Sequence, residues 1–307
     1  MKTYKEIPIN FYEIQDYFVT EKQDIINHFI TGEKYFFYDT CSLITHSDTL
    51  NRNYIINFLK NKHATIILTR TVLMELSSSE DNKIHTVQLN YLKELHDSNI
   101  KIILLDEEFI LHCLNAVINI NNENANKLLG FAINEISKFK GTIYEIKKLI
   151  QENHLKKLIG KNPGHKELYS DFFTFARSMK ESKDNLGEEL MFICFIILTK
   201  IPIGKCIFFS NDLNSRTNII SLNDYIYKHH DKKEPYQLTT ATLLYKMYIE
   251  NILTDRTKMI DILNSSTEGN IKVYYTGESD IKLQFDSFSK EDLVDRIMID
   301  SYFKIIY

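Results

Sequence analysis

Short unbroken runs of apolar residues recur along the chain, and each is followed by a segment with helical spacing. Runs of strand length occur at 35–38, 64–68, 100–105 and 205–210, and a shorter one opens the segment 236–253. Strands buried on both faces of a parallel sheet have continuous apolar sequences of this kind. Their alternation with helices predicts an α/β fold with a central parallel sheet of about four to five strands.

The long middle of the chain lacks this alternation. Residues 106–180 have almost no strand pattern, and GTIYEIKKLIQENHLKKLI within them has helical periodicity with lysines on the polar side. The segment GEELMFICFIILTK (187–200) is apolar all round, which predicts a buried helix, with a strand as the weaker alternative. We therefore expect an α/β domain at 33–254 with a helical insertion at about 106–180.

The two ends of the chain have different patterns. Residues 11–31 mix polar and apolar positions at helical spacing, so a leading helix is expected within an N-terminal helical segment at 1–32. In the last part, IKVYY and IKLQF flank TGESD, which predicts a hairpin, and a closing helix follows. Residues 255–307 are therefore expected to form a small α+β extension.

Composition narrows the class of protein. Of 307 residues, 44% are hydrophobic and 25% charged, as in ordinary globular proteins, and only 9 Gly and 4 Pro favour long helices. The four cysteines are widely spaced and the first residues contain no apolar signal-peptide region, which predicts a protein of the reducing cytoplasm. The longest apolar run, 190–198, is about half of what a bilayer requires, so no membrane association is expected.

The charge is unevenly distributed. The formal net charge is −4, which is not the overall charge of a typical nucleic-acid-binding domain. Lysines are nevertheless concentrated between Lys127 and Lys166, where few acids interrupt them. Such a segment is ordinarily a solvated helix face, but it can also attract a polyanion to a nearby acidic site. The candidates for such contacts are Lys156, Lys157, Lys161, His165 and Lys166.

Four acids stand where a parallel sheet collects ligands. Asp39 ends the first predicted strand, in KYFFYDTCSLI, and Asp212 follows the fourth. Glu75 falls in the helix after the second strand, and Glu188 begins the apolar helix before the fourth. Ligands bind outside the carboxyl ends of such strands. Crowded carboxylates repel one another unless a cation compensates them, and Mg²⁺ or Mn²⁺ prefers oxygen ligands of this type. The pattern thus predicts a metal site able to activate water against a phosphodiester.

The four segments also resemble a known family. FFYDTCSLI, ILTRTVLMEL, NLGEELMF and IFFSNDLNSR, in this order, are similar to the four acidic motifs of PIN-domain nucleases, over roughly residues 33–254. In the first motif a hydrophobic strand ends in Asp and then Thr or Ser, matched by Asp39, Thr40 and Ser42. The second motif maps to Glu75, and the third, Gly-Glu at a helix start, to Glu188.

The fourth motif and the spacing between motifs depart from the family pattern. A strand followed by Ser or Thr, one residue and Asp is matched by Ser210, Asn211 and Asp212. A further Asp often follows two residues later, where this chain has Asn214, whose carbonyl could still coordinate. The stretch between the second and third motifs is much longer than in a compact PIN domain.

The resemblance implies a metal-dependent endonuclease that cuts single-stranded RNA and leaves a 5′-phosphate and a 3′-hydroxyl. It implies that the four acids are catalytic and hold one or two Mg²⁺ or Mn²⁺ ions, and that Asp39 or Asp212 orients the attacking water. Thr40, Ser42 and Asn211 would support the ligands or contact phosphate. By analogy, such a protein could be a toxin of a toxin–antitoxin pair or an antiviral effector, could form a homodimer, and could be controlled by an inhibitory or effector partner protein.

Each acid also has an ordinary structural explanation. Asp39 could cap the next helix, and Glu188 could form a capping box with Asn185. Glu75 could be an exposed helix residue, and Asp212 could belong to an ordinary turn. Two neighbours compete with Glu188 for the role of third acid, namely Asp184 and Glu189.

Two other functions remain open from the sequence. One is a catalytically weak or inactive PIN-like module that binds RNA or a protein. The other is a metal-dependent phosphohydrolase acting on DNA or nucleotides. A Rossmann-type nucleotide enzyme is not favoured, because no glycine-rich phosphate loop follows any strand.

Overall fold

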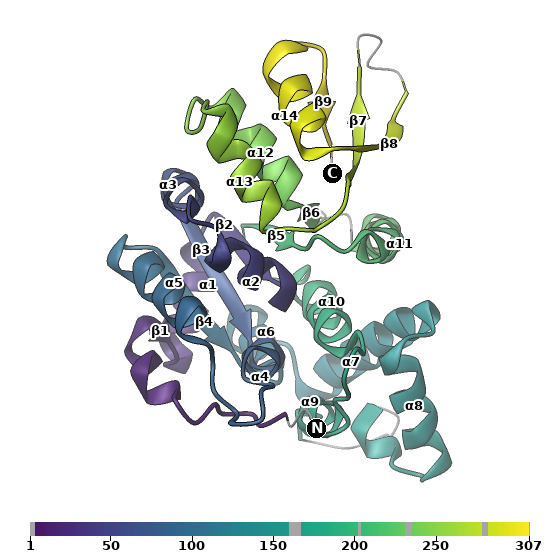
Figure 1. Cartoon of the computed structure of the whole chain (residues 1–307). Coiled ribbons are helices and arrows are strands. Elements are labelled where there is room, and N and C mark those ends of the chain that lie inside the picture. Colours follow the sequence, from purple (N-terminus) through teal and green to yellow (C-terminus); the bar gives the residue numbers. More distant parts are fainter. Residues whose placement is uncertain (1–3, 160–166, 202–203, 231–234, 278–281, 307) are drawn as a thin grey trace.

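Six parallel strands form the centre of the molecule (Figure 1). The computed structural model describes the chain except for residues 1–3, 160–166, 202–203, 231–234, 278–281 and 307. In their order across the sheet, the strands are β1 (Phe18–Val19), β4 (Lys101–Leu105), β3 (Ala64–Thr69), β2 (Lys34–Tyr38), β5 (Lys205–Phe209) and β6 (Tyr236–Leu238). The fold is therefore α/β with a parallel sheet.

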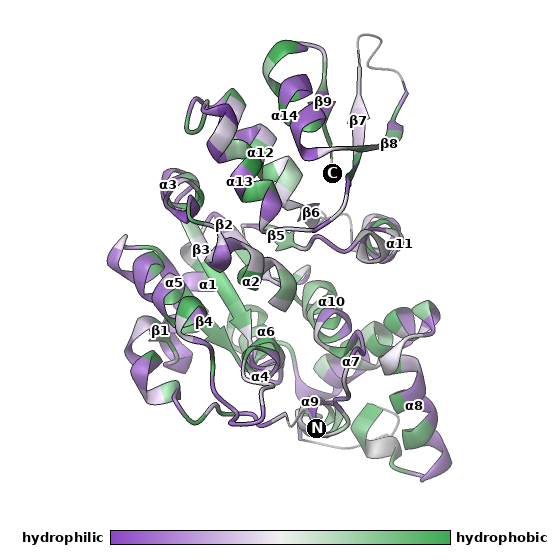
Figure 2. Ribbon diagram, in the orientation of Figure 1, coloured by the Kyte–Doolittle hydropathy of each residue, from purple (hydrophilic) through white to green (hydrophobic). Residues whose placement is uncertain are grey.

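The central strands are apolar because both of their faces are covered. All six residues of β3 are buried, as are the last four of β2. Phe36 in β2 lies between Ile66 of β3 and Ile207 of β5 in the strand register. Figure 2 shows β3 and β4 in the green of hydrophobic residues, whereas α5 and α8 alternate between purple and green, as helices that bury one face do.

Helices follow each strand at its carboxyl end. The crossovers from β2 through β3 to β4 contain helices that pack on one another, α2 against α3, α4 and α5. Their bounds are α2 (Thr40–Asp48), α3 (Arg52–Asn61), α4 (Arg70–Leu76) and α5 (Thr86–Asp97). After β1, α1 (Lys22–Thr31) contacts the first helix beyond β4, α6 (Phe109–Ile118).

The middle of the chain is helical, as the sequence predicts. Beyond α6, the helices of this region are α7 (Asn122–Ile136), α8 (Thr142–Glu152) and α9 (Asp171–Ser178), with 3-10 turns at Ser137–Phe139 and Lys156–Ile159. The apolar segment after them is the helix α10 (Leu186–Leu198), which confirms the helical alternative. Twelve of its residues are buried, because α10 packs against α6, α7, α8 and α11 (Leu213–His230) as well as lying near the sheet.

The C-terminal part packs beside the sheet. From β6 the chain enters α12 (Thr240–Ile249) and α13 (Arg256–Asn264). The expected hairpin is formed by β7 (Ile271–Thr276) and β8 (Gln284–Phe288), and the closing helix is α14 (Lys290–Ile299). The second strand of the hairpin, QFDSF, lies three residues further along the chain than the expected IKLQF. A last strand, β9 (Lys304–Ile305), pairs with β7 and contacts α12. In Figure 1 this yellow-green unit lies above β5, β6 and α11.

Two expectations need correction. The leading helix expected at 11–31 holds only for α1, because two short 3-10 turns and β1 precede it. The sheet has six strands rather than four or five, since Phe18 and Val19 pair with Ile102 and Ile103 at its edge. A strand of two residues is too short to leave a period-2 pattern, so the sequence could not reveal it. No helix in the described part of the chain is long and apolar enough to cross a bilayer.

Candidate functional site

Asp39 lies where the central strand β2 passes into α2. Its backbone N–H donates to the carbonyl of Phe209 at 3.0 Å, which joins the ends of β2 and β5. Its side chain caps α2 by accepting the backbone N–H of Ser42 at 2.6 Å. The capping role considered from sequence is therefore real, and it fixes the direction of the carboxylate at the carboxyl edge of the sheet.

The residue before Asp39 holds α2 in place. The buried hydroxyl of Tyr38 lies 3.0 Å from Nδ1 of His46 on α2 and 3.2 Å from the hydroxyl of Tyr91. His46 Nε2 lies 3.2 Å from Thr240 Oγ1 at the start of α12. Burial lowers the pKa of His46 to about 3, so this ring is neutral. Its two nitrogens connect α2 to Tyr38 and to Thr240.

The environment of Asp39 opposes its ionisation. Burial raises the pKa of its carboxyl to about 6, although hydrogen bonds from Ser210 and Ser42 act in the opposite direction. The negative charge of Glu75 raises it further. A carboxylate in this setting gains from a nearby cation.

Glu75 lies in the second turn of α4 and is tightly held. Oε2 accepts a hydrogen bond from the hydroxyl of Thr40, the residue after Asp39. Oε1 forms an ion pair of 2.9 Å with Nζ of Lys180. A Cβ on Gly187 would come within 3.0 Å of the same Oε1. Glycine at this position of α10 is therefore what allows α4 and α10 to bring their acids together.

Glu188 follows on the first turn of α10. Burial, then the negative charges of Asp212 and Asp39, raise the pKa of its carboxyl to about 8, against a hydrogen bond from Asn218 that lowers it. Its buried Oε1 has no hydrogen-bond partner among the described residues. Among the described residues, the side chain of Asn185 makes no capping hydrogen bond at the start of α10. The capping box considered from sequence is therefore not formed.

Asp212 lies in the loop between β5 and α11. The side-chain amide of Gln237 in β6 donates to the carbonyls of Ser210 at 2.8 Å and of Asp212 at 3.0 Å, which pins the loop to the sheet. Asn211 is used in the same way, since its Oδ1 accepts the backbone N–H of Thr240 at 2.8 Å. The side chain of Asp212 is exposed, so among the four acids it is the one most open to solvent.

Cys41 lies within electrostatic range of all four acids. The pKa of its thiol is raised to about 11, first by burial and then by the charges of Asp39, Glu75, Asp212 and Glu188. The four acids come from four different elements of the fold and surround the first turn of α2. Figure 1 shows α2, α4 and α10 next to one another at this place.

The two competing acids on the third motif have other tasks. Glu189 is buried, and its Oε2 accepts the backbone N–H of Ile143 at 2.6 Å, so it caps the first turn of α8. Asp184 accepts the backbone N–H groups of Glu181 at 2.7 Å and Leu186 at 3.2 Å and also pairs with Lys180. Glu188 is thus the acid of this segment that shares its field with Asp39 and Asp212.

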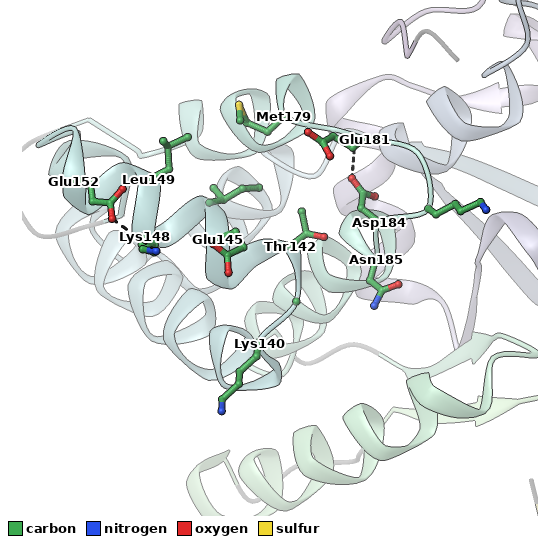
Figure 3. A pocket seen from close by; sticks show the side chains of 13 residues that line it. Lys140, Thr142, Glu145, Lys148, Leu149, Glu152, Met179, Glu181, Asp184 and Asn185 are labelled. Carbon is green, nitrogen blue, oxygen red and sulfur yellow. Dashed lines mark hydrogen bonds and ion pairs between the residues drawn. The ribbon is translucent and has the colours of Figure 1, made fainter. Parts of the chain in front are cut away.

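Several expected residues fall outside the described part of the chain. These are Lys161, His165 and Lys166, and also the side chains of Lys156, Lys157 and Asn214. Other lysines of the basic region are described. Lys140 and Lys148 line a cavity of about 560 Å³ between α8 and the segment 179–185, which also contributes Lys183 (Figure 3). This cavity reaches Asp184 and Asn185 and therefore adjoins the start of α10.

Sequence reasoning missed the buried cations beside the acids. Lys180 contacts both Glu75 and Asp184, and only 3% of its side chain is exposed. Burial acts to lower its pKa, but these two acids raise it above the ordinary value. The stretch RSMKESK around Lys180 shows no pattern from which this contact could be read.

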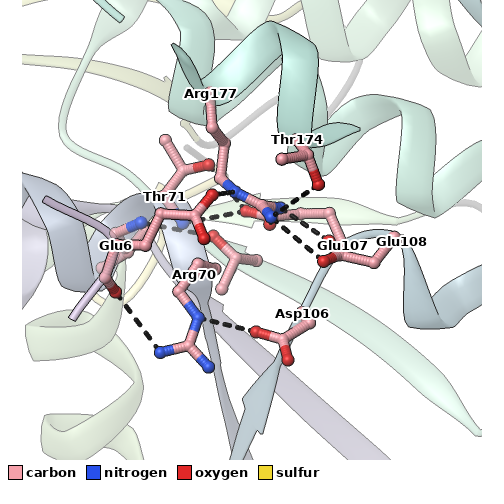
Figure 4. Close-up of polar contacts among 10 residues, drawn as sticks. Glu6, Arg70, Thr71, Asp106, Glu107, Glu108, Thr174 and Arg177 are labelled. Carbon is pink, nitrogen blue, oxygen red and sulfur yellow. Dashed lines mark hydrogen bonds and ion pairs between the residues drawn. The ribbon is translucent and has the colours of Figure 1, made fainter. Parts of the chain in front are cut away.

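Arg177 is the second buried cation that the sequence did not reveal. Its guanidinium pairs with Glu107 at 2.7 Å, Glu108 at 2.7 Å and Glu6 at 2.9 Å (Figure 4). The carboxylate of Glu107 also accepts the backbone N–H and the hydroxyl of Thr71 at 2.9 and 2.7 Å. This network ties α9 to the start of α6 and to the start of α4, the helix that carries Glu75.

The donor set at the sheet edge suits a hard divalent cation. No three His, Cys, Asp or Glu side chains in the described residues converge closely enough to be a ready-made metal site. Thr40 and Lys180 hold Glu75, whereas Glu188 keeps a buried oxygen without a partner next to the charges of Asp39 and Asp212. All of these donors are carboxylate oxygens, which fit Mg²⁺ or Mn²⁺ better than softer metals.

Comparison with known proteins gives no relative. No family model, no curated protein and no solved structure matches this chain. The site must therefore be interpreted from its own chemistry.

Proposed function

We propose that this chain is a Mg²⁺- or Mn²⁺-dependent endonuclease that hydrolyses phosphodiester bonds of single-stranded RNA. The observation that carries the proposal is the gathering of Asp39, Glu75, Glu188 and Asp212 at the carboxyl edge of a parallel sheet. Ligands of open α/β sheets bind at this edge. Four carboxylates crowded there repel one another, which destabilises the fold unless a bound cation compensates their charge.

The acidic side chains of the site would have different roles in the reaction. Asp39, Glu188 and Asp212 would hold the divalent ion, which supplies a more acidic water and neutralises charge that builds on the phosphate. Asp212 is the exposed member and is best placed to orient the attacking water from solvent. Asp39 is fixed by its capping bond to Ser42, so its carboxylate requires little reorganisation.

Three lysines that could contact RNA line the cavity beside the start of α10. Lys140, Lys148 and Lys183 are accompanied there by four acids, Glu145, Glu152, Glu181 and Asp184. The lysines therefore offer individual contacts to phosphate groups and not a uniformly positive surface. We propose that an RNA strand reaches the acids across this cavity.

The direct test is cleavage of labelled single-stranded RNA in Mn²⁺ and in EDTA. We expect cutting by the wild type in Mn²⁺, none in EDTA, and a loss of at least about 100-fold in Asp39→Asn and Asp212→Asn, as for groups that act on the transition state. Asp16→Asn, which changes an exposed acid in the 3-10 turn before β1 and outside the four motifs, is the matched control. Equal activity of Asp39→Asn and wild type would refute the assignment.

One observation favours a second function, a non-catalytic module that binds RNA. Glu75 is already engaged by Thr40 and Lys180, so one of the four acids is less available to a metal. Such a module would retain RNA in EDTA and would cut neither RNA, DNA nor nucleotides in any divalent metal. Running DNA and nucleotides beside RNA in the same assay also separates a phosphohydrolase of different substrate class.

A further inference from the structure

The ammonium group of Lys180 is built into the acidic site. It lies 2.9 Å from Oε1 of Glu75 and also pairs with Asp184, four residues further along the chain. The ring of Tyr4 lies beneath it, with 5.3 Å between Nζ and the ring centre. With 3% of its side chain exposed, Lys180 is almost as well buried as a core residue.

Its position is fixed from several sides. Asp184 is itself held by the backbone N–H groups of Glu181 and Leu186, so the turn between α9 and α10 is closed around the lysine. Figure 3 shows Asp184 joined to Glu181 in this turn. Glu75 cannot swing away freely, because Thr40 holds its other oxygen and Gly187 lies against Oε1. The lysine therefore does more than form a loose surface ion pair.

The ammonium of Lys180 lies between two carboxylates, that of Glu75 in the acidic site and that of Asp184 in the turn before α10. In two-metal phosphodiesterases, a pair of divalent ions about 3.5–4 Å apart shares the acids of one site. Here a fixed monovalent cation already pairs with both Glu75 and Asp184. A second divalent ion beside Lys180 would be repelled by the charge of the ammonium group and would overlap the space that the side chain occupies.

From this we infer that the site takes a single divalent ion, held by Asp39, Glu188 and Asp212, and that the Lys180 ammonium stands where the second ion of a two-metal nuclease would bind. This inference rests on the proposed function. Lys180 is then a positioning residue: it holds Glu75 against α10 and contributes a fixed positive charge beside the reacting phosphate. A lysine is suited to this role as a compact point charge.

The test is the number of Mn²⁺ ions bound per chain, measured by calorimetry, together with the electron paramagnetic resonance spectrum of the bound ions. Two ions at the separation of a two-metal site couple magnetically, whereas a single ion does not. We expect one uncoupled ion in the wild type and in Lys180→Arg, which keeps the charge. In Lys180→Met, where Glu75 and Asp184 lose their cation, we expect two ions per chain and a coupled spectrum.

The outcomes separate this inference from the proposed function. Two coupled ions in the wild type would overturn the inference while leaving the metal site in place. This result requires no substituted protein. No bound ion in the wild type would overturn the proposed function and the inference together. If Lys180→Met melts at a lower temperature but still binds one uncoupled ion, the lysine contributes only to stability and the inference is wrong.

Discussion

Replacing Glu188 by Gln should stabilise the metal-free protein at pH values above about 4.5, and most strongly at alkaline pH. The carboxyl of Glu188 has a folded-state pKa of about 8, raised from 4.5 by burial and by Asp212 and Asp39. Between these two values the folded protein keeps the proton and the unfolded chain loses it. Stability therefore falls as pH rises through this window, by up to about 1.4 kcal/mol per pH unit. Glutamine resembles the protonated acid and removes this pH dependence.

The size of the effect follows from the same pKa. Ionising Glu188 in the folded state costs about 5 kcal/mol once the pH exceeds about 8. Because the side chain is only partly shielded from water, we expect a measured difference of about 3–5 kcal/mol at pH 9. At pH 4.5 the folded wild type is protonated at this site and the unfolded chain is half protonated, so the difference should be below about 0.5 kcal/mol.

Urea unfolding of both proteins in EDTA, from pH 4.5 to 9, measures this difference directly. Taking the variant minus the wild type cancels the titration of the groups that do not interact with Glu188. Glu152→Gln, at an exposed position on α8, is the matched control and should change stability by less than about 0.5 kcal/mol at every pH. Saturating Mn²⁺ should narrow the difference at pH 8, because an ion at 100 times its Kd stabilises the wild type by about 2.7 kcal/mol. A difference that is flat with pH, or that favours the wild type in EDTA at pH 9, would refute the account of this acid.

Three further predictions concern the surroundings of the acids. Arg177→Met leaves the buried carboxylate of Glu107 without its cation and should cost about 3–5 kcal/mol in urea unfolding at pH 7; a loss below about 1 kcal/mol would contradict the network. Gly187→Ala places a Cβ within 3.0 Å of Glu75 Oε1, so Mn²⁺-dependent cleavage should fall while the thermal midpoint changes little; unchanged cleavage would mean that this close approach is dispensable. Lys140→Glu combined with Lys183→Glu should weaken binding of single-stranded RNA and lower the slope of log K against log salt by about 1.4; an unaltered slope in a filter-binding titration would remove the cavity from the RNA path.

The sequence predicted the interior of the sheet well because burial leaves an unmistakable pattern. A strand covered on both faces must be apolar throughout, so β2 and β3 could be located to within a residue or two. The apolar α10 was found for the same reason. At the sheet edge this signal disappears: β1 contributes two residues, and its neighbours are polar and exposed. Edge strands are defined by their partners more than by their own sequence.

The candidate site could be predicted only as far as it depends on chain order. Asp39 and Asp212 follow strands directly, so the rule for ligands at carboxyl ends sufficed to bring them together. Choosing between Glu188 and Glu189 was a different problem, since adjacent helix residues point about 100° apart and only the packing of α10 decides which one faces the other acids. Glu189 accepts a hydrogen bond from the first turn of α8, and no local sequence pattern predicts the position of that helix.

The buried cations explain why the helical insertion belongs to the site. Both Arg177 and Lys180 come from the end of this insertion, three residues apart, and each neutralises an acid that touches α4. Arg177 holds Glu107, which in turn binds the backbone and hydroxyl of Thr71 at the start of α4. Lys180 holds Glu75 near the end of the same helix. Without these two side chains, α4 would be flanked at both ends by uncompensated carboxylates, which is unfavourable in a low-dielectric interior. The insertion therefore completes the charge balance of the acidic edge, and long-range contacts of this kind leave no periodic trace in the sequence.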